Sequence, residues 1–150
     1  ILREIHMDCR KAAGADEPQI RALLEQAQLP TESLGTNVTE FFVAEEAGVI
    51  IGIAGFEYYG DDALLRSVAM RSDQRNLGRG SALVDWMLAR AKAHRMKRVV
   101  LLSDTAKTFF ERKGFQVVDR SLITNDSLKK SSEFASVCPA SSTTMMLNLM

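Results

Sequence analysis

The sequence predicts an α/β fold in which a mixed, mostly antiparallel sheet of about six to seven strands is flanked by about four helices. Aromatic and β-branched runs at residues 41–45, 49–59 and 64–70, separated by glycine-containing turns, indicate an antiparallel meander. A long amphipathic helix then leads directly into an apolar run at residues 99–103. Strand, helix and strand of this length imply a right-handed crossover to a parallel neighbour, so the sheet is expected to be mixed.

The segment before the meander predicts a strand at residues 8–13 and a first helix of about ten residues. Asp16 is expected to be the N-cap of this helix, with Pro18 in its first turn. Residues 31–39 are rich in polar and turn-forming types and indicate a loop or a poorly formed second helix. The apolar residues of the first helix recur at helical spacing: Ile20, Leu23, Leu24 and Ala27.

Helices and strands continue to alternate after residue 103. The Asp104-Thr105 pair is expected to cap a shorter helix that Gly114 closes, and residues 115–118 form the next strand. The chain then becomes polar up to residue 142, with a short helix capped by Asn125-Asp126 and ended by Pro139. Polar and apolar residues alternate sufficiently over residues 143–149 to predict the last strand.

The bulk composition describes an ordinary globular protein. Nineteen basic and nineteen acidic residues balance among 150, so nothing favours nucleic-acid or membrane-surface binding, and no apolar run could span a bilayer. Cys9 and Cys138 lie far apart, without metal-ligand spacing, and the sequence shows no signal-peptide pattern, so we expect no metal and a reduced, cytoplasmic setting rather than a disulfide framework. Residues 1–6 are expected to be a cloning remnant before Met7, and residues 7–150 to form a single domain.

Residues 65–83 contain a strand, a turn with two glycines and the start of the long helix. Arg75-x-x-Gly78-x-Gly80 offers a cation, two positions without side chains and the free N–H groups of a helix start, where a diphosphate could lie. A dinucleotide fingerprint requires a third glycine, and a phosphate loop requires Gly-Lys-Ser/Thr; both are missing. That the glycines merely permit a tight turn stays an alternative.

Two motifs in this order resemble the GNAT superfamily of acyl-CoA-dependent N-acyltransferases. The first is Val68-Ala69-Met70 followed by Arg75-Asn76-Leu77-Gly78-Arg79-Gly80, and the second is Phe109-Phe110 followed by Gly114-Phe115. A finer resemblance, carried by residues 64–69 and 131–139, is to the short acetyltransferases of arsenic-resistance operons and to the catalytic domain of N-acetylglutamate synthases.

The resemblance implies acetyl-CoA as the acyl donor and no metal. The backbone of residues 68–70 would pair with the pantetheine arm, and the N–H groups of residues 76–81 would hold the pyrophosphate. The expected coenzyme-binding residues are Val68, Ala69, Met70, Arg75, Asn76, Leu77, Gly78, Arg79, Gly80, Ser81, Thr105, Phe109 and Phe110.

The implied reaction is direct attack of a neutral amine on the acetyl thioester. Glu57, late in its strand, is the candidate base, directly or through water; an exposed or ion-paired carboxylate is the alternative. A backbone N–H of Met70 is the candidate oxyanion donor. Many family members have a Tyr at the position of Phe110, and its hydroxyl can protonate the leaving thiolate. In this chain water, Ser103 or Thr105 could supply that proton, or no acid is needed. Core packing is the favoured role of Phe110 and of Phe109.

Arg66 is the unusual residue in an otherwise apolar strand, and its guanidinium could clamp a carboxylate of the acceptor. The alternative is a surface or structural salt bridge. Ser132 and Ser136 could add hydrogen bonds from the polar insertion. The expected activity is acetylation of the primary amine of a small, carboxylate-bearing molecule such as an amino acid, through a ternary complex.

Two other functions stay open at this point. The missing Tyr also fits a catalytically silent acyl-CoA-binding regulatory module. A protein lysine or N-terminal acetyltransferase is the third interpretation, although the long insertion would crowd a peptide groove. The last strand, flanked by that insertion, could support a homodimer.

Overall fold

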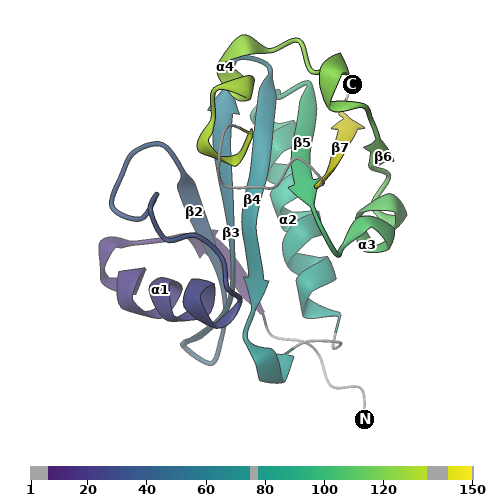
Figure 1. The fold of residues 1–150 in the computed structure, drawn as a ribbon. Helices are drawn as coiled ribbons and strands as arrows, with labels where there is room; N and C mark the ends of the chain where they lie inside the picture. Colours follow the sequence, from purple (N-terminus) through teal and green to yellow (C-terminus); the bar gives the residue numbers. More distant parts are fainter. Residues whose placement is uncertain (1–6, 75–77, 135–141, 150) are drawn as a thin grey trace. The chain divides into compact units, whose positions relative to one another are not determined.

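The computed structural model describes residues 7–74, 78–134 and 142–149, and in these ranges seven strands form one sheet. The order across the sheet is β1-β2-β3-β4-β5-β7-β6, in which β4 and β5 are parallel while the β1–β2, β2–β3, β5–β7 and β6–β7 pairs are antiparallel (Figure 1). The predicted mixed α/β fold is therefore confirmed. The strands are β1 Asp8–Lys11, β2 Glu40–Glu46, β3 Val49–Tyr59, β4 Asp62–Met70, β5 Arg98–Ser103, β6 Gln116–Val117 and β7 Thr143–Asn148, and the α-helices are α1 Glu17–Gln26, α2 Arg79–Ala93, α3 Lys107–Arg112 and α4 Asp126–Lys129.

The chain packs as two compact units. The first consists of residues 1–56 with 67–87, and the second of residues 57–66 with 88–150. Both β3 and β4 contribute to each unit. Within the described ranges, no helix combines the length and the apolar character that crossing a lipid bilayer requires.

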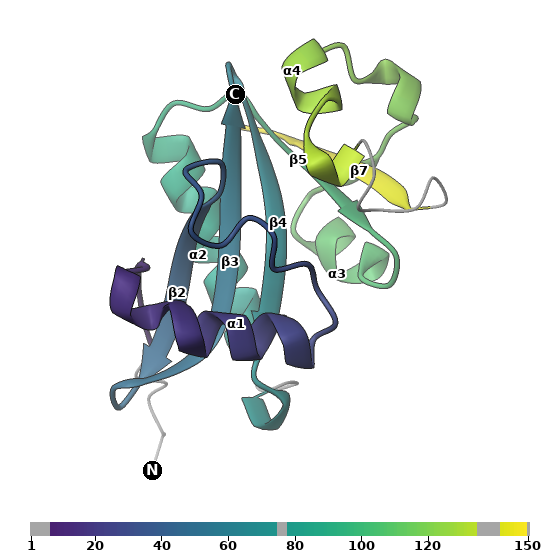
Figure 2. The ribbon, with the colours of Figure 1, turned by 60° about the vertical axis from the view of Figure 1, so that its left-hand side comes forward.

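The core of the first unit forms on both faces of β2. On one face, α1 lies across β2 and β3 (Figure 2), and its apolar residues pack on those strands. On the opposite face, Phe42 contacts Trp86 of α2, with 5.4 Å between ring centroids. Because successive strand residues point to opposite faces, β2 is covered on both sides. The buried cluster under α1 consists of Ile20, Leu23, Leu24, Phe41, Val43, Ile50 and Ile53.

The core of the second unit joins the first half of β4, β5 and the segment that carries α4. Leu64 and Val100 lie at its centre, on the two parallel strands, and the polar insertion covers them with its few apolar side chains. This packing explains how a largely polar segment is held to the sheet. The insertion contributes Ile123, Leu128 and Phe134 to the cluster.

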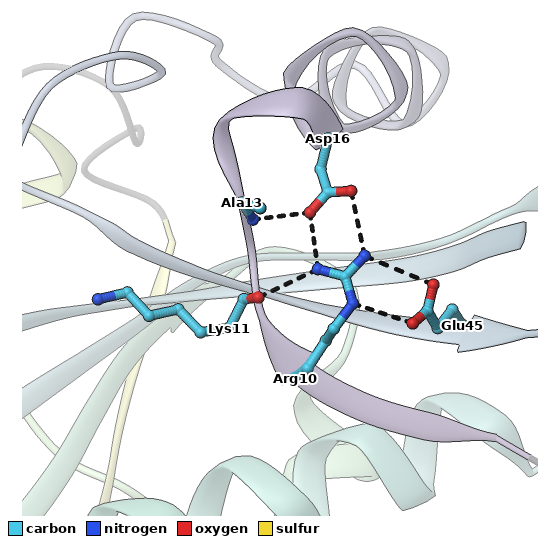
Figure 3. Close-up of polar contacts among 5 residues, drawn as sticks. All are labelled: Arg10, Lys11, Ala13, Asp16 and Glu45. Carbon is cyan, nitrogen blue, oxygen red and sulfur yellow. Dashed lines mark hydrogen bonds and ion pairs between the residues drawn. The ribbon is translucent and has the colours of Figure 1, made fainter. Parts of the chain in front are cut away.

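Asp16 stands at the N-cap of α1, as predicted, but its side chain makes no capping hydrogen bond to the helix. Its carboxylate instead accepts a hydrogen bond from the backbone N–H of Ala13, at 2.7 Å, and pairs with Arg10 at 2.8 Å. Figure 3 shows the guanidinium of Arg10 lying between the carboxylates of Asp16 and Glu45. Because Arg10 contacts both oxygens of Asp16 in a bidentate pair between two charged groups, the carboxylate is held away from the first N–H groups of α1.

The predicted cap of α3 is wrong, whereas that of α4 is confirmed. Ala106 is the N-cap residue of α3, and the hydroxyl of Ser103 accepts a hydrogen bond from Ala106 N–H, at 2.9 Å, in the turn that precedes the helix. In α4 the side chain of Asn125 accepts from Leu128 N–H at 3.1 Å. The predicted end of this helix is wrong, because α4 ends at Lys129, well before Pro139, which lies outside the described residues.

We predict that Gly55→Ala destabilises the protein. A Cβ at this position would lie 2.8 Å from the methyl group of Thr39 and 3.4 Å from the ring of Phe41. Such overpacking costs about 1–3 kcal/mol, measurable by urea unfolding. Gly14→Ala is the matched control, because a Cβ there meets nothing within 4 Å. Equal stability of the two variants would contradict the prediction.

We also predict that the stabilisation by Asp16 depends on pH. Hydrogen bonds from Arg10, and then from the Ala13 backbone, hold the pKa of the Asp16 carboxyl below its usual range. A pKa lowered by folding stabilises the fold above the unfolded pKa of about 4, and this contribution is lost as the pH falls through the folded value. Asp16→Asn should therefore lower the free energy of unfolding by about 1–2 kcal/mol at about pH 7.

The difference between Asp16→Asn and the wild type should shrink as the pH is lowered toward about 3, because the wild-type carboxyl then becomes neutral as well. Glu25→Gln, an exposed change on α1, is the control for a general loss of negative charge. A stability difference that is constant from neutral to acid pH would contradict the assignment.

Candidate active site

The first unit contains the end of β4 and the start of α2, the region where the sequence predicts the coenzyme diphosphate. Ala69 is buried, while Val68 and Met70 are half-buried. Gly78 has φ 76°, a left-handed conformation that favours glycine, and α2 begins at the next residue. A Cβ on Gly80 would lie 3.4 Å from Cγ of Met70, so the first turn of α2 lies directly against the end of β4.

This helix start has the chemistry of an anion site. The first N–H groups of an α-helix have no acceptor within the helix, and the helix dipole makes its N-terminus positive. The guanidinium of Arg79 is already paired with a carboxylate, that of Glu46 on β2. The backbone N–H groups of this turn, rather than the Arg79 side chain, are therefore best suited to bind an anion. The residues that the structure describes here therefore fit a diphosphate.

Ser67 interrupts the extended geometry of β4. Its φ is 57°, in the left-handed region, between Arg66 and Val68. A single residue in this conformation bends a strand and redirects the side chains on either side of it. The parallel register with β5 covers Asp62 to Leu64, before this bend.

The second unit contains a buried ion pair between β3 and β4. Nη1 of Arg66 donates to Oε2 of Glu57 at 2.6 Å, and both side chains are 1% exposed. The hydroxyl of Tyr59 donates to Oε1 of the same carboxylate. Burial, and then the hydrogen bond to Glu57, raise the pKa of Tyr59, so its hydroxyl is a proton donor in this cluster. Both oxygens of Glu57 therefore accept hydrogen bonds.

Arg66 also contacts the polar insertion. Nη1 donates to the hydroxyl of Ser132 at 3.3 Å, and Nη2 lies 3.5 Å from Oε1 of Glu133, a side chain that is 9% exposed. The guanidinium thus joins the two strands to the insertion. We call Glu57, Tyr59, Arg66, Ser132 and Glu133 the Arg66 cluster.

The structure brings together three of the predicted acceptor-site residues: Glu57, Arg66 and Ser132. The ion-paired alternative for Glu57 and the salt bridge considered for Arg66 are both observed, with the difference that this pair is buried. Sequence reasoning missed Tyr59 and Glu133. Glu133 lay within the segment 131–139 that carried the finer resemblance, and Tyr59 follows Glu57 by two residues on the same strand, so it points to the same face.

The second motif is a packing element in this structure. Phe110 is buried and forms edge-to-face contacts with Phe109 and Phe115, at centroid distances of 5.0 and 5.5 Å. This confirms the expected packing of Phe110. Ser103 is engaged by the Ala106 backbone and Thr105 is exposed. The predicted residues Arg75, Asn76, Leu77 and Ser136 lie outside the described residues.

Comparisons with known proteins identify relatives of this chain in sequence and in fold. The "Amino-acid acetyltransferase" of Pasteurella multocida is 29% identical over 105 residues, which are 67% of this chain and 24% of that protein. The chain thus spans about a quarter of the length of the curated relatives it matches. Rv2747 from Mycobacterium tuberculosis, solved in complex with CoA and NLQ, superposes with a TM-score of 0.82 at 25% identity, covering 95% of this chain and 99% of that one.

The N-acetylglutamate synthase from Neisseria gonorrhoeae, solved with coenzyme A and N-acetyl-glutamate, has the same fold in part of its length. The TM-score is 0.83 at 21% identity, over 99% of this chain and 36% of that one. In addition, the acetyltransferase (GNAT) domain family matches residues 37–117, more than half of the chain and the part that contains β2 to β6. The chain therefore belongs to the GNAT acetyltransferase domain family.

Proposed function

We propose that this protein transfers an acetyl group from acetyl-CoA to the primary amine of an amino acid or a related carboxylate-bearing amine. The observation that carries the proposal is the buried guanidinium of Arg66, placed with Ser132 beside the candidate base Glu57 in a member of this family. Relatives named amino-acid acetyltransferases support the same acceptor class.

The coenzyme supplies the activated acetyl thioester. In the first unit, the backbone of Val68, Ala69 and Met70 would pair with its pantetheine arm, and the turn from Gly78 to Ser81 would hold its diphosphate. A backbone N–H of Met70 is the proposed donor to the developing oxyanion. Arg75, Asn76, Leu77, Thr105, Phe109 and Phe110 stay predicted coenzyme contacts.

The amine must lose a proton to attack the thioester, because an ammonium has no lone pair. Glu57 is the proposed base, directly or through water. Since Tyr59 and Arg66 already donate to its two oxygens, a proton that reaches Glu57 replaces one of these hydrogen bonds. Arg66 and Ser132, with Ser136 from the sequence prediction, would bind the acceptor's carboxylate.

A catalytically silent acyl-CoA-binding module is the second candidate. The burial of Phe110 among Phe109 and Phe115 favours it, because no hydroxyl is available at this position to protonate the leaving thiolate. A cytoplasmic location and a homodimer stay part of the proposal, on the sequence grounds given above.

We predict that Gly80→Asp weakens the binding of acetyl-CoA. The new carboxylate would stand beside the diphosphate and should weaken binding about tenfold or more, measured by isothermal titration calorimetry. Gly80→Asn is the matched control, because it adds the same volume without the charge and should bind more tightly than Gly80→Asp. Wild-type affinity in Gly80→Asp, or equal affinity of the two variants, would contradict a diphosphate at this turn.

We predict that a panel of L-amino acids contains an acceptor, detected as thiol release above background hydrolysis. Arg66→Lys, which keeps the charge but loses the forked geometry, should raise the KM for that acceptor about tenfold and leave the KM for acetyl-CoA within about twofold. Arg98→Lys is the control, because Arg98 pairs with Asp62 at 2.6 Å in the same unit.

Equal effects of Arg66→Lys on the KM values of both substrates would contradict the role of Arg66 in binding the acceptor's carboxylate. If acetyl-CoA raises the melting temperature but no amine increases thiol release, the protein is a catalytically silent acyl-CoA-binding module and not an acetyltransferase.

A further inference from the structure

The two carboxylates that contact Arg66 differ in the length of that contact. Glu57 approaches Nη1 to 2.6 Å and also accepts the hydroxyl of Tyr59. Glu133 approaches Nη2 only to 3.5 Å, longer than the 2.7–3.2 Å that is typical of an N–H···O hydrogen bond. Glu133 is thus the looser partner of the guanidinium.

Among the described residues, the Arg66 cluster contains two acidic side chains and one guanidinium, all at most 9% exposed. Like charges that share a site with little water repel strongly, because neither can be screened by solvent. A carboxylate that enters from outside must therefore displace one of the two that are present.

Glu133 makes the longer of the two contacts with Arg66, so its contact is the one that an entering carboxylate would replace. Glu57 lies within β3, where both of its oxygens are engaged by neighbouring strand residues. Glu133 belongs to the insertion beyond α4, where the adjacent Phe134 is buried in the core. The backbone here is fixed by that contact, so the exchange requires the Glu133 side chain to turn toward water rather than a strand to move.

We propose that Glu133 determines the acceptor specificity of this protein, by occupying Nη2 of Arg66 until the carboxylate of an acceptor takes its place. The exchange conserves charge, because one carboxylate enters as another leaves for water. An amine without a carboxylate cannot replace the negative charge beside Arg66, so it leaves Glu133 in place. The inference rests on the proposed function, since it assumes that Arg66 receives the acceptor.

Glu133→Gln tests this inference, because the amide keeps the shape of the side chain and removes the competing charge. The KM for an amino-acid acceptor should fall about threefold to tenfold. The KM for the same amine without its carboxylate, and that for acetyl-CoA, should stay within about twofold. Glu111→Gln, an exposed change on α3, is the control and should alter none of these values.

A raised KM for the amino acid would show that Glu133 helps to bind the acceptor, and an unchanged one that it does not compete; either result overturns the proposal. Equal changes with and without the acceptor carboxylate would also overturn it. Thermal unfolding of each variant checks that the fold is retained.

A readout without catalysis separates this inference from the proposed function. The melting temperature in sodium acetate, compared with sodium chloride at equal ionic strength, reports the binding of a small carboxylate. Sodium acetate should raise the melting temperature of Glu133→Gln more than that of the wild type, because the competing carboxylate is removed. If no amine is acetylated but this pattern is seen, the carboxylate exchange stands without acetyl transfer. If amino acids are acetylated and acetate shifts both proteins equally, the exchange is wrong and the proposed function stands.

Discussion

The ion pair between Glu57 and Arg66 is the interaction on which the second unit depends. Removing two charges from water is costly, and a buried pair recovers that cost only when its remaining hydrogen-bonding groups are also satisfied. Here Tyr59 and Ser132 supply those bonds, so the end of β3, the start of β4 and the insertion must assemble together. Apolar side chains of similar volume could fill such a space with equal stability, so stability alone does not account for the charges.

The architecture follows from local patterns, and the sequence predicted it well. The bounds of β3 are those predicted, because a run of β-branched and aromatic residues between two glycine turns has few alternatives. The helix caps were predicted less well. Asp16 stands at the predicted N-cap of α1, but whether its carboxylate bonds to the N–H groups of that helix or to Arg10 depends on where the fold brings Arg10, Asp16 and Glu45 together. Residue type does not contain that information.

In the candidate site, too, local features were predictable from the sequence and contacts between distant segments were not. The glycine turn before α2 uses backbone geometry within one continuous stretch, so Gly78 and Gly80 were readable from the sequence. Arg66 was noticed because a charged residue in an apolar strand requires a partner. Which partner it has was not readable, because Ser132 and Glu133 reach it across 66 and 67 residues of chain. Tyr59 was missed for a simpler reason: a tyrosine in a strand usually signals packing.

Coenzyme binding through the backbone and acceptor binding through side chains place different demands on the sequence of an acetyltransferase of this family. A coenzyme held by backbone groups places few demands on side chains, so the motif that reports it says little about the acceptor. The acceptor is distinguished by side chains from distant segments, where one charge more or less changes what is bound. Among the described residues, the Arg66 cluster sets two carboxylates, Glu57 and Glu133, against one guanidinium. In the exchange that we propose for Glu133, an arginine already occupied by an internal acid favours ligands that can replace that acid, so selectivity would arise from competition as well as from attraction.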